Sequence, residues 1–461
     1  MTDLATRHDG QDGMEAALTP GFVRSVLDAV DRADAVEVKR LVVELRPADM
    51  AELLELLRQD ERHDLIDMLG ADFDTEVLSE LDESVRDDVL ERLDPKDIAA
   101  ALTEMDSDDA VYLLEDLDEK DQREILDQLP ASDRAAIEQS LDYPEYSAGR
   151  LMQRELVAVP PFWDVGQTID YLREAETLPD AFYEIFVVDP GYKPIGTVPL
   201  SRIMRMKRPT KISEIMETEQ TLIPVTMDQE DVAYQFNKYD LISAAVVDEN
   251  DRLVGVVTVD DIVDVIAEEA SEDIRLLGGV GEESISDSII QTTRSRFSWL
   301  FINLLTAILA STVIGFFDAT ISQMVALAVL MPIVASMGGN AGTQTMTIAV
   351  RALATRDLVP FNASRIITRE VMVGFINGIM FAVLMGLAGG LWFENASLGL
   401  VLAAAMIINM LAAGFAGILI PIGLDKMGVD PAVSSAVFLT TVTDVVGFFA
   451  FLGLAALVLA H

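Results

Sequence analysis

The sequence predicts a multidomain chain with an acidic α-helical superhelix, a tandem pair of α/β modules and a polytopic α-helical membrane domain with five spans. Three observations support this prediction. Apolar and acidic residues recur with a twelve-residue period near the N-terminus, a strand–turn–strand pattern occurs twice in the middle, and five long apolar stretches follow residue 296. The 461 residues are enough for three domains of ordinary size.

The net charge of −44 lies entirely in the first 290 residues, because residues 291–461 hold seven acidic and seven basic side chains. Such a surface repels nucleic acid and attracts cations, although solubility in a salt-rich host explains the acidity alone equally well. The absence of Cys excludes disulfides and thiolate metal sites. Residues 1–20 are predicted to be a disordered N-terminus without a secretory signal, so the first 290 residues are expected in the cytoplasm.

Residues 21–145 are predicted to form the helical superhelix. Leu81, Leu93, Met105, Leu117 and Leu129 recur at intervals of twelve residues. An Asp stands four residues after each of the last four, at Asp97, Asp109, Asp121 and Asp133. This period suits short helices that each begin at an Asp or Ser cap and stack on the next. Capping therefore accounts for many of these carboxylates without any ligand.

After Gly149, strand and helix signals alternate, and the same alternation occurs twice. The matching strand pairs are residues 185–189 with 194–198 and residues 244–248 with 253–257. A helical segment precedes each pair, and a polar turn joins its two strands. This arrangement resembles a tandem pair of CBS domains, which we place at residues 146–210 and 211–270.

The resemblance to CBS domains implies a regulatory module that binds ATP or another adenine nucleotide. Thr258 and Asp261 in the second copy match the nucleotide pattern of that family, with Thr258 towards phosphate and Asp261 towards ribose. The first copy has Pro199 and Arg202 at the equivalent positions. We therefore expect at most one nucleotide site per chain.

Five apolar stretches predict five membrane-spanning helices in a domain of residues 297–461. They cover residues 297–317, 324–350, 371–393, 398–424 and 431–461. Each can cross roughly 30 Å of hydrocarbon as a helix. The second connection carries Arg351, Arg356, Arg365 and Arg369, which favours a cytoplasmic position for it and an outside position for the C-terminus.

Asp444 is the one charged side chain within these stretches. A carboxylate near the centre of a membrane helix costs roughly 2.5 to 3.5 kcal/mol on insertion scales, so it usually faces a water-filled path or a partner charge. Helical periodicity places Thr440 and Gly447 on the same face as Asp444. The fifth span holds no basic partner, so Asp444 requires a cation or a proton.

The second span has the composition of an irregular helix. Pro332 lacks an amide donor and Gly338 and Gly339 loosen the turns, so carbonyl oxygens can leave the helical ladder. Asn340 and Gln344 add neutral oxygen donors of the kind that Mg²⁺ or Ca²⁺ accepts. A kinked packing helix, whose Asn and Gln side chains bond to neighbours, is the alternative interpretation.

The order of an acidic superhelix, a CBS pair, a connecting helix and five spans resembles the MgtE family of magnesium channels from about residue 23 to the end. Two motifs support the resemblance, MPxVAxxGGNxGxQ in the second span and DPAxxS followed by TxxD in the fifth. It implies a homodimeric pore in which Asp444 holds hydrated Mg²⁺ and Asn340 lies beside that ion. It also implies that backbone carbonyls at Ser336 and Thr440 line the site.

The same resemblance implies regulatory Mg²⁺ sites in the cytoplasmic domains and a connecting helix, residues 271–296, that closes the pore from inside. The candidate ligands are Asp108, Asp109, Asp228, Glu230, Asp240, Asp264, Glu269, Glu272 and Asp273. Mg²⁺ bridging these carboxylates would draw the cytoplasmic domains of two subunits together, and its loss would open the pore.

The predicted function is therefore a Mg²⁺-gated Mg²⁺ uptake channel of a prokaryotic plasma membrane, homodimeric and without a nucleic-acid partner. One alternative is a proton- or sodium-coupled carrier of Mn²⁺, Co²⁺ or Mg²⁺, in which Asp444 alternates between proton and metal. A second alternative is a membrane-anchored sensor that carries no ions. An enzyme is not expected, because the sequence has no P-loop and only three His residues.

Overall fold

The computed structural model describes residues 18–115, 117–175, 178–179, 181–281 and 289–459. The chain divides into two compact units, with the change from the first to the second at Ala267 and Glu268. The segment predicted to be disordered, residues 1–20, lies outside the described residues up to position 17. Its last residue, Pro20, already begins helix α1, which the Thr19 side chain caps.

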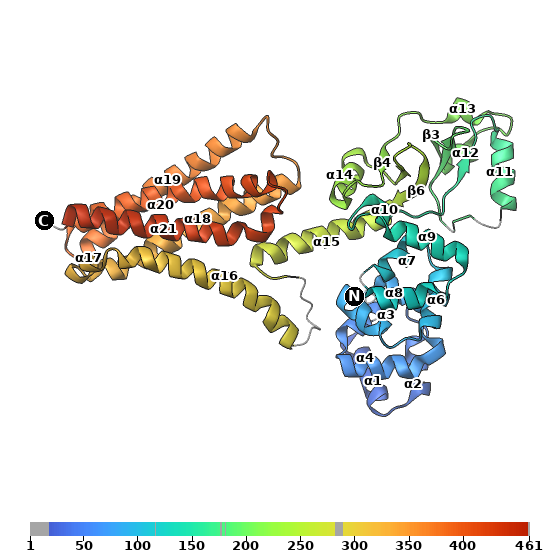
Figure 1. Cartoon of the computed structure of the whole chain (residues 1–461), viewed down its shortest axis with the longest axis horizontal. Helices are drawn as coiled ribbons and strands as arrows, with labels where there is room; N and C mark the ends of the chain where they lie inside the picture. The colour runs from blue at the N-terminus through green and yellow to red at the C-terminus, as the bar shows by residue number, and fades with distance from the viewer. Residues whose placement is uncertain (1–17, 116, 176–177, 180, 282–288, 460–461) are drawn as a thin grey trace, which may run out of the picture. The chain divides into compact units, whose positions relative to one another are not determined.

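The first unit starts with a stack of short helices (Figure 1). They are α1 (Pro20–Asp31), α2 (Ala35–Val42), α3 (Pro47–Leu56), α4 (Gln59–Leu69), α5 (Glu83–Leu90), α6 (Pro95–Glu104), α7 (Ser107–Leu114), α8 (Glu119–Leu126) and α9 (Ala131–Leu141), with 3-10 turns η1 (Gly70–Asp72) and η2 (Thr75–Glu80). Asp82, Asp94, Asp106 and Asp118 are the N-cap residues of α5 to α8, so the twelve-residue period marks helix starts. Of these four, Asp94 caps its helix with its side chain, which accepts a hydrogen bond of 3.0 Å from the Lys96 amide. Side-chain capping therefore explains fewer of the carboxylates than the sequence suggests.

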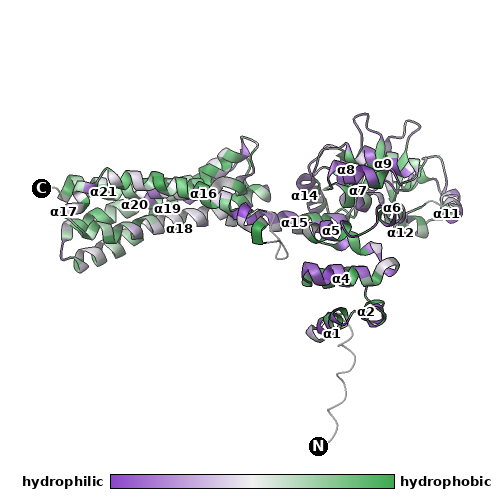
Figure 2. Cartoon of the chain, turned by 60° about the horizontal axis from the view of Figure 1, so that its bottom comes forward, coloured by the Kyte–Doolittle hydropathy of each residue, from purple (hydrophilic) through white to green (hydrophobic). Residues whose placement is uncertain are grey.

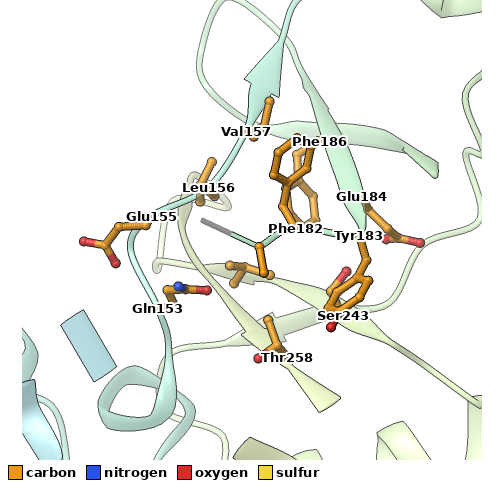
Figure 3. A pocket seen from close by; sticks show the side chains of 12 residues that line it. Gln153, Glu155, Leu156, Val157, Phe182, Tyr183, Glu184, Phe186, Ser243 and Thr258 are labelled. Carbon is orange, nitrogen blue, oxygen red and sulfur yellow. The ribbon is translucent and has the colours of Figure 1, made fainter. Parts of the chain in front are cut away.

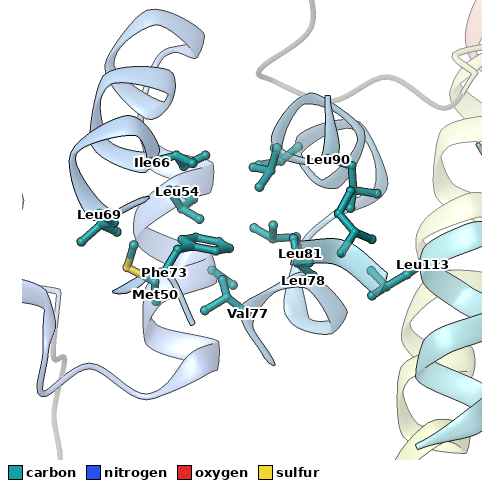
Figure 4. Close-up of a cluster of buried hydrophobic side chains, with 14 of the residues drawn as sticks. Met50, Leu54, Ile66, Leu69, Phe73, Val77, Leu78, Leu81, Leu90 and Leu113 are labelled. Atoms are coloured by element: carbon teal, nitrogen blue, oxygen red, sulfur yellow. The ribbon is translucent and has the colours of Figure 1, made fainter. Parts of the chain in front are cut away.

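Apolar side chains from successive helices of the stack meet in one buried cluster. Figure 4 shows Leu54 of α3, Phe73, Leu78 of η2 and Leu113 of α7 in this cluster. Leu54 and Leu78 are completely buried. Burying one Leu side chain contributes roughly 1.5 to 3 kcal/mol. Helices this short are marginal alone, so packing on the neighbouring helices stabilises them.

Two α/β modules follow, each with a three-stranded sheet. The first contains β1 (Ala158–Val159), α11 (Val165–Glu174), β2 (Glu184–Val188), β3 (Pro194–Pro199) and α12 (Leu200–Arg205); the second contains β4 (Leu222–Pro224), α14 (Gln229–Tyr239), β5 (Ser243–Val247), β6 (Leu253–Thr258) and α15 (Val259–Gly278). Strand β1 is parallel to β2, and β2 is antiparallel to β3, with the same pattern in β4, β5 and β6. The equal topology confirms that the modules are two copies of one motif, as expected of a CBS pair.

The core of each module includes a short helix that lies within the predicted residue range of the other module. Helix α10 (Ala148–Leu151) and Met152, predicted in the first copy, pack in the core of the second, and Gln153 pairs with Val256 of β6. Helix α13 (Ile212–Ile215), predicted in the second copy, packs in the core of the first. The predicted boundary between residues 210 and 211 therefore separates the sheets but not the cores.

Two equivalent glycines make room for the exchanged segments. A Cβ at Gly255 would lie 2.6 Å from the Met152 sulfur, and one at Gly196 would lie 2.6 Å from the Glu217 carbonyl oxygen. Strands β6 and β3 can therefore accept a crossing chain only because these positions have no side chain. This long-range contact leaves no periodic signal in the sequence.

The second unit holds the membrane helices. They are α16 (Ile289–Gly315), α18 (Ala326–Ala354), α19 (Ala363–Trp392), α20 (Ala396–Asp425) and α21 (Pro431–Leu459), with the short α17 (Asp318–Gln323) after the first. Among the described residues, five helices are long and apolar enough to cross a membrane, which confirms the five predicted spans. Figure 2 shows hydrophobic colour along these helices and mixed colour on the helices of the first unit. Helix α20 packs against α18, α19 and α21 and is the most buried of the five.

Two details of this unit differ from the sequence prediction. Helix α18 is continuous through Pro332, so the second span, expected to be irregular, is a single helix in which that residue supplies no amide donor. The bounds of the connecting helix, predicted at residues 271–296, also differ in the structure. Helix α15 begins at Val259, directly after β6, and ends at Gly278, where Gly279 has a φ of 70°. Residues 282–288 lie outside the described residues, and Ile289 already belongs to α16.

Candidate functional site

Helices α18 and α21 lie in close contact because glycines of α18 face side chains of α21. A Cβ at Gly342 would lie 2.7 Å from Leu439 Cδ1, so a larger residue there would have to displace the Leu439 side chain. One turn further, a Cβ at Gly339 would lie 4.0 Å from the Thr443 hydroxyl oxygen. This packing brings together the two helices that carry the predicted pore residues.

The polar residues of α18 form an exposed stripe on a membrane helix. Ser336, Asn340, Thr343 and Thr347 recur every three or four residues, and all four are exposed in the single chain. The Thr343 and Thr347 hydroxyls donate to carbonyl oxygens of their own helix, at 3.0 and 2.9 Å. Their lone pairs, together with the Asn340 side chain, leave a row of neutral oxygen acceptors on this surface.

On α21, Thr440 is exposed and Asp444 is half-buried. The Thr440 hydroxyl donates to the Ala436 and Val437 carbonyls of its own helix, at 3.0 and 3.1 Å. Gly447, which the sequence places on the same face, is instead buried against α20. In the part of the chain that the structure describes, no salt bridge reaches the Asp444 carboxylate. The arrangement suits a cation that approaches from the exposed side.

In the first unit, the predicted ligands Asp108 and Asp109 lie near the start of α15. A hydrogen bond of 2.8 Å from the Ser107 hydroxyl to Glu155 joins α7 to the segment before β1. The charges of Asp108 and Asp109 act on Asp260, Asp261 and Asp264 of α15. We call Asp108, Asp109, Asp260, Asp261 and Asp264 the carboxylate cluster.

Burial and mutual repulsion oppose ionisation within the carboxylate cluster. Burial, followed by the charges of Asp261 and Asp109, raises the pKa of Asp108 well above its ordinary value. Burial, followed by the charges of Asp106 and Glu80, raises the pKa of Asp109 to about 6. Burial raises the pKa of Asp261 to about 7, although the Thr258 hydroxyl donates a hydrogen bond that lowers it. A cation at this place would relieve the repulsion.

The predicted ligands on α14 have structural roles and do not lie together. The Asp228 side chain caps the helix by accepting from the Glu230 amide at 3.0 Å, and Glu230 lies in the first turn. Asp240 ends the same helix in the left-handed region, with a φ of 52°. The two ends are roughly 18 Å apart along the axis at 1.5 Å per residue. A single ion within one chain cannot join them.

Glu269, Glu272 and Asp273 share one face of the last turns of α15. Burial, followed by the charges of Asp430 and Glu269, raises the pKa of Asp273. Asp430 accepts from the Ala432 amide at 2.7 Å and so caps α21. The end of α15 therefore lies at the start of the helix that carries Asp444.

No three His, Asp or Glu side chains converge closely enough in the described residues to hold a bare metal ion. The carboxylates offer hard oxygen donors, which suit Mg²⁺. The spacing fits an ion that keeps part of its hydration shell or that is shared with another chain.

Thr258 lines a small pocket between the two modules, whereas Asp261 does not (Figure 3). The wall combines aromatic side chains with polar ones; it includes Phe182, Tyr183, Phe186, Gln153, Glu184 and Ser243. The Asp261 carboxylate accepts from the Thr258 hydroxyl at 2.8 Å and belongs to the carboxylate cluster. Of the two predicted nucleotide ligands, the structure therefore places one at the pocket.

Sequence reasoning missed Asn409 of α20, which is completely buried beside α18 and α21. The sequence does not single it out, because Asn303 and Asn377 also interrupt apolar spans. Neither of those two residues is buried to this extent. Only the packing distinguishes Asn409 from them.

Five apolar helices with polar residues on adjoining helix surfaces define a multi-pass membrane protein. Family models match three segments: a divalent cation transporter domain (MgtE) at residues 331–454, the MgtE intracellular N domain at 45–146 and a CBS domain at 212–268. The chain is 34% identical to the magnesium transporter MgtE of Thermus thermophilus over 71% of this chain and 73% of that protein. It is 32% identical to the Enterococcus faecalis protein of the same name over 70% and 72%.

The chain belongs to the MgtE family, as the sequence motifs indicate. Along the chain, the helical stack comes first, the CBS pair second and the five spans last, in the order in which the family models match. The N-terminal part is cytoplasmic. A solved structure described as the cytosolic domain of the Mg²⁺ channel MgtE with ATP is 31% identical, covering 53% of this chain and 99% of that one at a TM-score of 0.48.

Proposed function

We propose that the chain is a homodimeric Mg²⁺ uptake channel of a prokaryotic plasma membrane, with its C-terminus outside, which closes when cytoplasmic Mg²⁺ binds. The observation that carries this proposal is the exposed polar stripe of α18 beside Asp444 of α21. The oxygen donors of the α18 stripe and the Asp444 carboxylate lie on adjoining helices, and neither the stripe nor the turn of α21 at residues 440–444 includes a basic side chain. The relatives of the chain bear the name magnesium transporter.

The stripe favours a dimer because exposed Asn340 and Thr440 side chains are unfavourable in hydrocarbon. Polar groups at membrane depth face protein or water rather than lipid. A second copy that covers the same surface satisfies this requirement and places two Asp444 carboxylates at one axis. Two carboxylates facing a shared path attract a divalent cation more strongly than a monovalent one.

The ion is expected to pass with most of its water. Mg²⁺ dehydrates reluctantly and usually keeps several waters, so Asp444 and Asn340 would contact it through its hydration shell. The membrane potential supplies about 2.3 kcal/mol per charge per 100 mV, and a divalent ion gains about twice that amount. Entry therefore requires no hydrolysis.

Closure is expected to come from the carboxylate cluster and from the last turns of α15. Mg²⁺ bound among these carboxylates lowers their repulsion and favours the arrangement in which they lie close together. Asp228, Glu230 and Asp240 would join such sites through the partner chain. Because α15 runs from β6 to Leu276 and Leu277 beside the membrane helices, its position can report the occupancy of these sites.

The pocket beside Thr258 is expected to receive the base and ribose of ATP or another adenine nucleotide. Its aromatic side chains can stack on a purine. The lining holds Glu155 and Glu184 and no Lys or Arg, so the phosphates would enter with a bound cation or remain outside.

Patch recordings from giant liposomes that contain the purified protein test the proposal. We expect stepwise Mg²⁺ currents with low Mg²⁺ at the cytoplasmic face, and their loss when that face is raised to millimolar Mg²⁺. Stepwise currents exclude a stoichiometric carrier. Mg²⁺ transport without current steps but coupled to protons or sodium would favour the carrier, and no flux would favour the sensor.

Asp444→Ala is expected to abolish the Mg²⁺ current and to leave the protein folded. Glu394→Ala, which removes a carboxylate two residues after the end of α19, is the matched control and should conduct normally. Normal current through Asp444→Ala would remove Asp444 from the mechanism.

A further inference from the structure

Asn409 lies inside the membrane unit where three helices meet. It belongs to α20, is completely buried, and donates a hydrogen bond of 2.7 Å from Nδ2 to the Val334 carbonyl of α18. Its Oδ1 atom is buried and has no hydrogen-bond partner among the described residues. A buried amide in this state is unfavourable compared with an apolar side chain of the same shape. Its presence in the bundle therefore requires a reason other than stability.

The Asn409 carboxamide occupies the space of two missing side chains. A Cβ at Gly338 of α18 would lie 2.1 Å from Asn409 Nδ2, and a Cβ at Gly447 of α21 would lie 2.8 Å from the same atom. Neither glycine can carry a side chain without displacing the carboxamide. The amide is thus wedged between the backbones of α18 and α21 and spaces both helices.

The wedge lies close to the candidate ion ligands along both helices. Gly338 precedes Asn340 by two residues, and Gly447 follows Asp444 by three, which corresponds to roughly 3 and 4.5 Å of helix rise. Any change in the separation of the two helices at this level therefore moves Asn340 relative to Asp444.

We propose that Asn409 is a positioning residue for the cation path: its carboxamide sets the separation of α18 and α21 and thereby the geometry of Asn340 and Asp444. This inference rests on the proposed function, because those two residues contact the ion only if the chain conducts Mg²⁺. Asn409 itself does not touch the ion. Its effect is on the affinity and the selectivity of the site.

The test is a set of variants measured by Mg²⁺ influx into liposomes as a function of external Mg²⁺, with Ca²⁺ as the competing ion. Asn409→Ala is expected to raise the half-saturating Mg²⁺ concentration by about ten-fold or more, the range found for residues that orient metal ligands. The preference for Mg²⁺ over Ca²⁺ should fall with it. Met406→Ala is the matched control, because Met406 is equally buried on α20 but packs in an apolar cluster. It should lower only the yield or the maximal flux.

Gly338→Ala supplies a compensating change. Alone it should damage the site, because its methyl group collides with the carboxamide. Combined with Asn409→Ala it enters the space that the carboxamide leaves, so the double variant should regain half-saturation closer to the original value than either single variant. The inference is overturned if Asn409→Ala behaves like Met406→Ala, or if the double variant is as impaired as the worse single one.

A second measurement is independent of transport. The chain has no Cys, so the pair Gly339→Cys and Thr443→Cys reports the contact between α18 and α21 by disulfide formation. The oxidation rate with Asn409→Ala should differ several-fold from the rate with Asn409, and it should return towards the original rate when Gly338→Ala is added. Absence of Mg²⁺ flux in the unmodified protein would contradict the proposed function alone, whereas equal oxidation rates in all three would contradict the spacing role.

Discussion

Asp109 and Asp261 carry charges that the fold disfavours at neutral pH. Burial and neighbouring carboxylates raise their pKa values from 3.8 to about 6 and about 7. The folded protein therefore binds more protons than the unfolded chain between about pH 4 and 7, and in that range these groups lower stability as the pH rises. A divalent cation would replace the protons and restore stability.

This argument predicts a linked effect of pH and Mg²⁺ on thermal unfolding of the full chain in detergent. Without divalent ions, the first unit should unfold at a lower temperature at pH 7.5 than at pH 5.5. Added Mg²⁺ should raise the unfolding temperature strongly at pH 7.5 and weakly at pH 5.5, where protons compete. Differential scanning fluorimetry measures both.

The variant pair for this prediction is Asp109→Asn with Asp261→Asn. These isosteric changes remove the repulsion, so the protein should be more stable without Mg²⁺ at pH 7.5 and respond less to its addition. The control is Asp60→Asn, an exposed carboxylate of α4, which should leave the response unchanged. A Mg²⁺ response that the double variant retains in full would assign the regulatory ion to other residues.

At the scale of single elements, α15 links the two units of the chain. Ile262 and Val265 of its first half pack in the core of the second α/β module, and Leu276 and Leu277 of its last turn pack against α18, α20 and α21. Because α15 is continuous over twenty residues, we expect it to transmit the state of the cytoplasmic domains to the membrane helices.

Weakening the packing of the last turn of α15 is expected to impair closure by cytoplasmic Mg²⁺ without impairing conduction. Each half-buried Leu contributes about 1 kcal/mol by burial, so Leu276→Ala with Leu277→Ala removes about 2 kcal/mol from the packed state. That loss shifts an open–closed equilibrium by about 30-fold. If the proposed gating holds, the double variant should conduct at cytoplasmic Mg²⁺ concentrations at which the unmodified protein does not.

Ile274→Ala provides the comparison for that experiment, because Ile274 lies on the same helix but is exposed. It should gate like the unmodified protein in the same patch recordings. Closure of the Leu276 and Leu277 double variant at the usual Mg²⁺ concentration would show that this contact does not hold the pore shut.

At the scale of the whole molecule, the polar stripe of α18 predicts a dimer in the membrane. Because the chain has no Cys, Ser336→Cys introduces a single thiol on that stripe. Oxidation in native membranes should give a covalent dimer of two 50.3 kDa chains.

Leu384→Cys is the control for the dimer, since Leu384 is an exposed apolar residue of α19 that is expected to face lipid. It should remain monomeric under the same oxidation. Equal cross-linking of the two variants would indicate random collision, and a monomeric Ser336→Cys protein would place the stripe away from a two-fold axis.

The features that depend on a short stretch of sequence could be predicted from the sequence alone. The five spans, the duplicated strand pairs, the helix starts at every twelfth residue and the lone Asp444 all depend on hydrophobicity, turn chemistry or charge within a short segment. These signals do not depend on which segments come into contact in the folded chain. For the same reason they were sufficient to indicate the family.

Only the tertiary structure decided which of these residues lie together. The continuous course of α18 through Pro332, the exchange of α10 and α13 between the modules, and the carboxylate cluster of α7 and α15 all depend on packing between distant segments. Asn409 bonds to Val334, 75 residues away, and Asn303 and Asn377, which also stand in apolar spans, look the same in the sequence. The sequence by itself determined the kind of molecule and the lone charge of its fifth span, while the close packing of helices through glycine decided that Asn409 is buried beside α18 and α21.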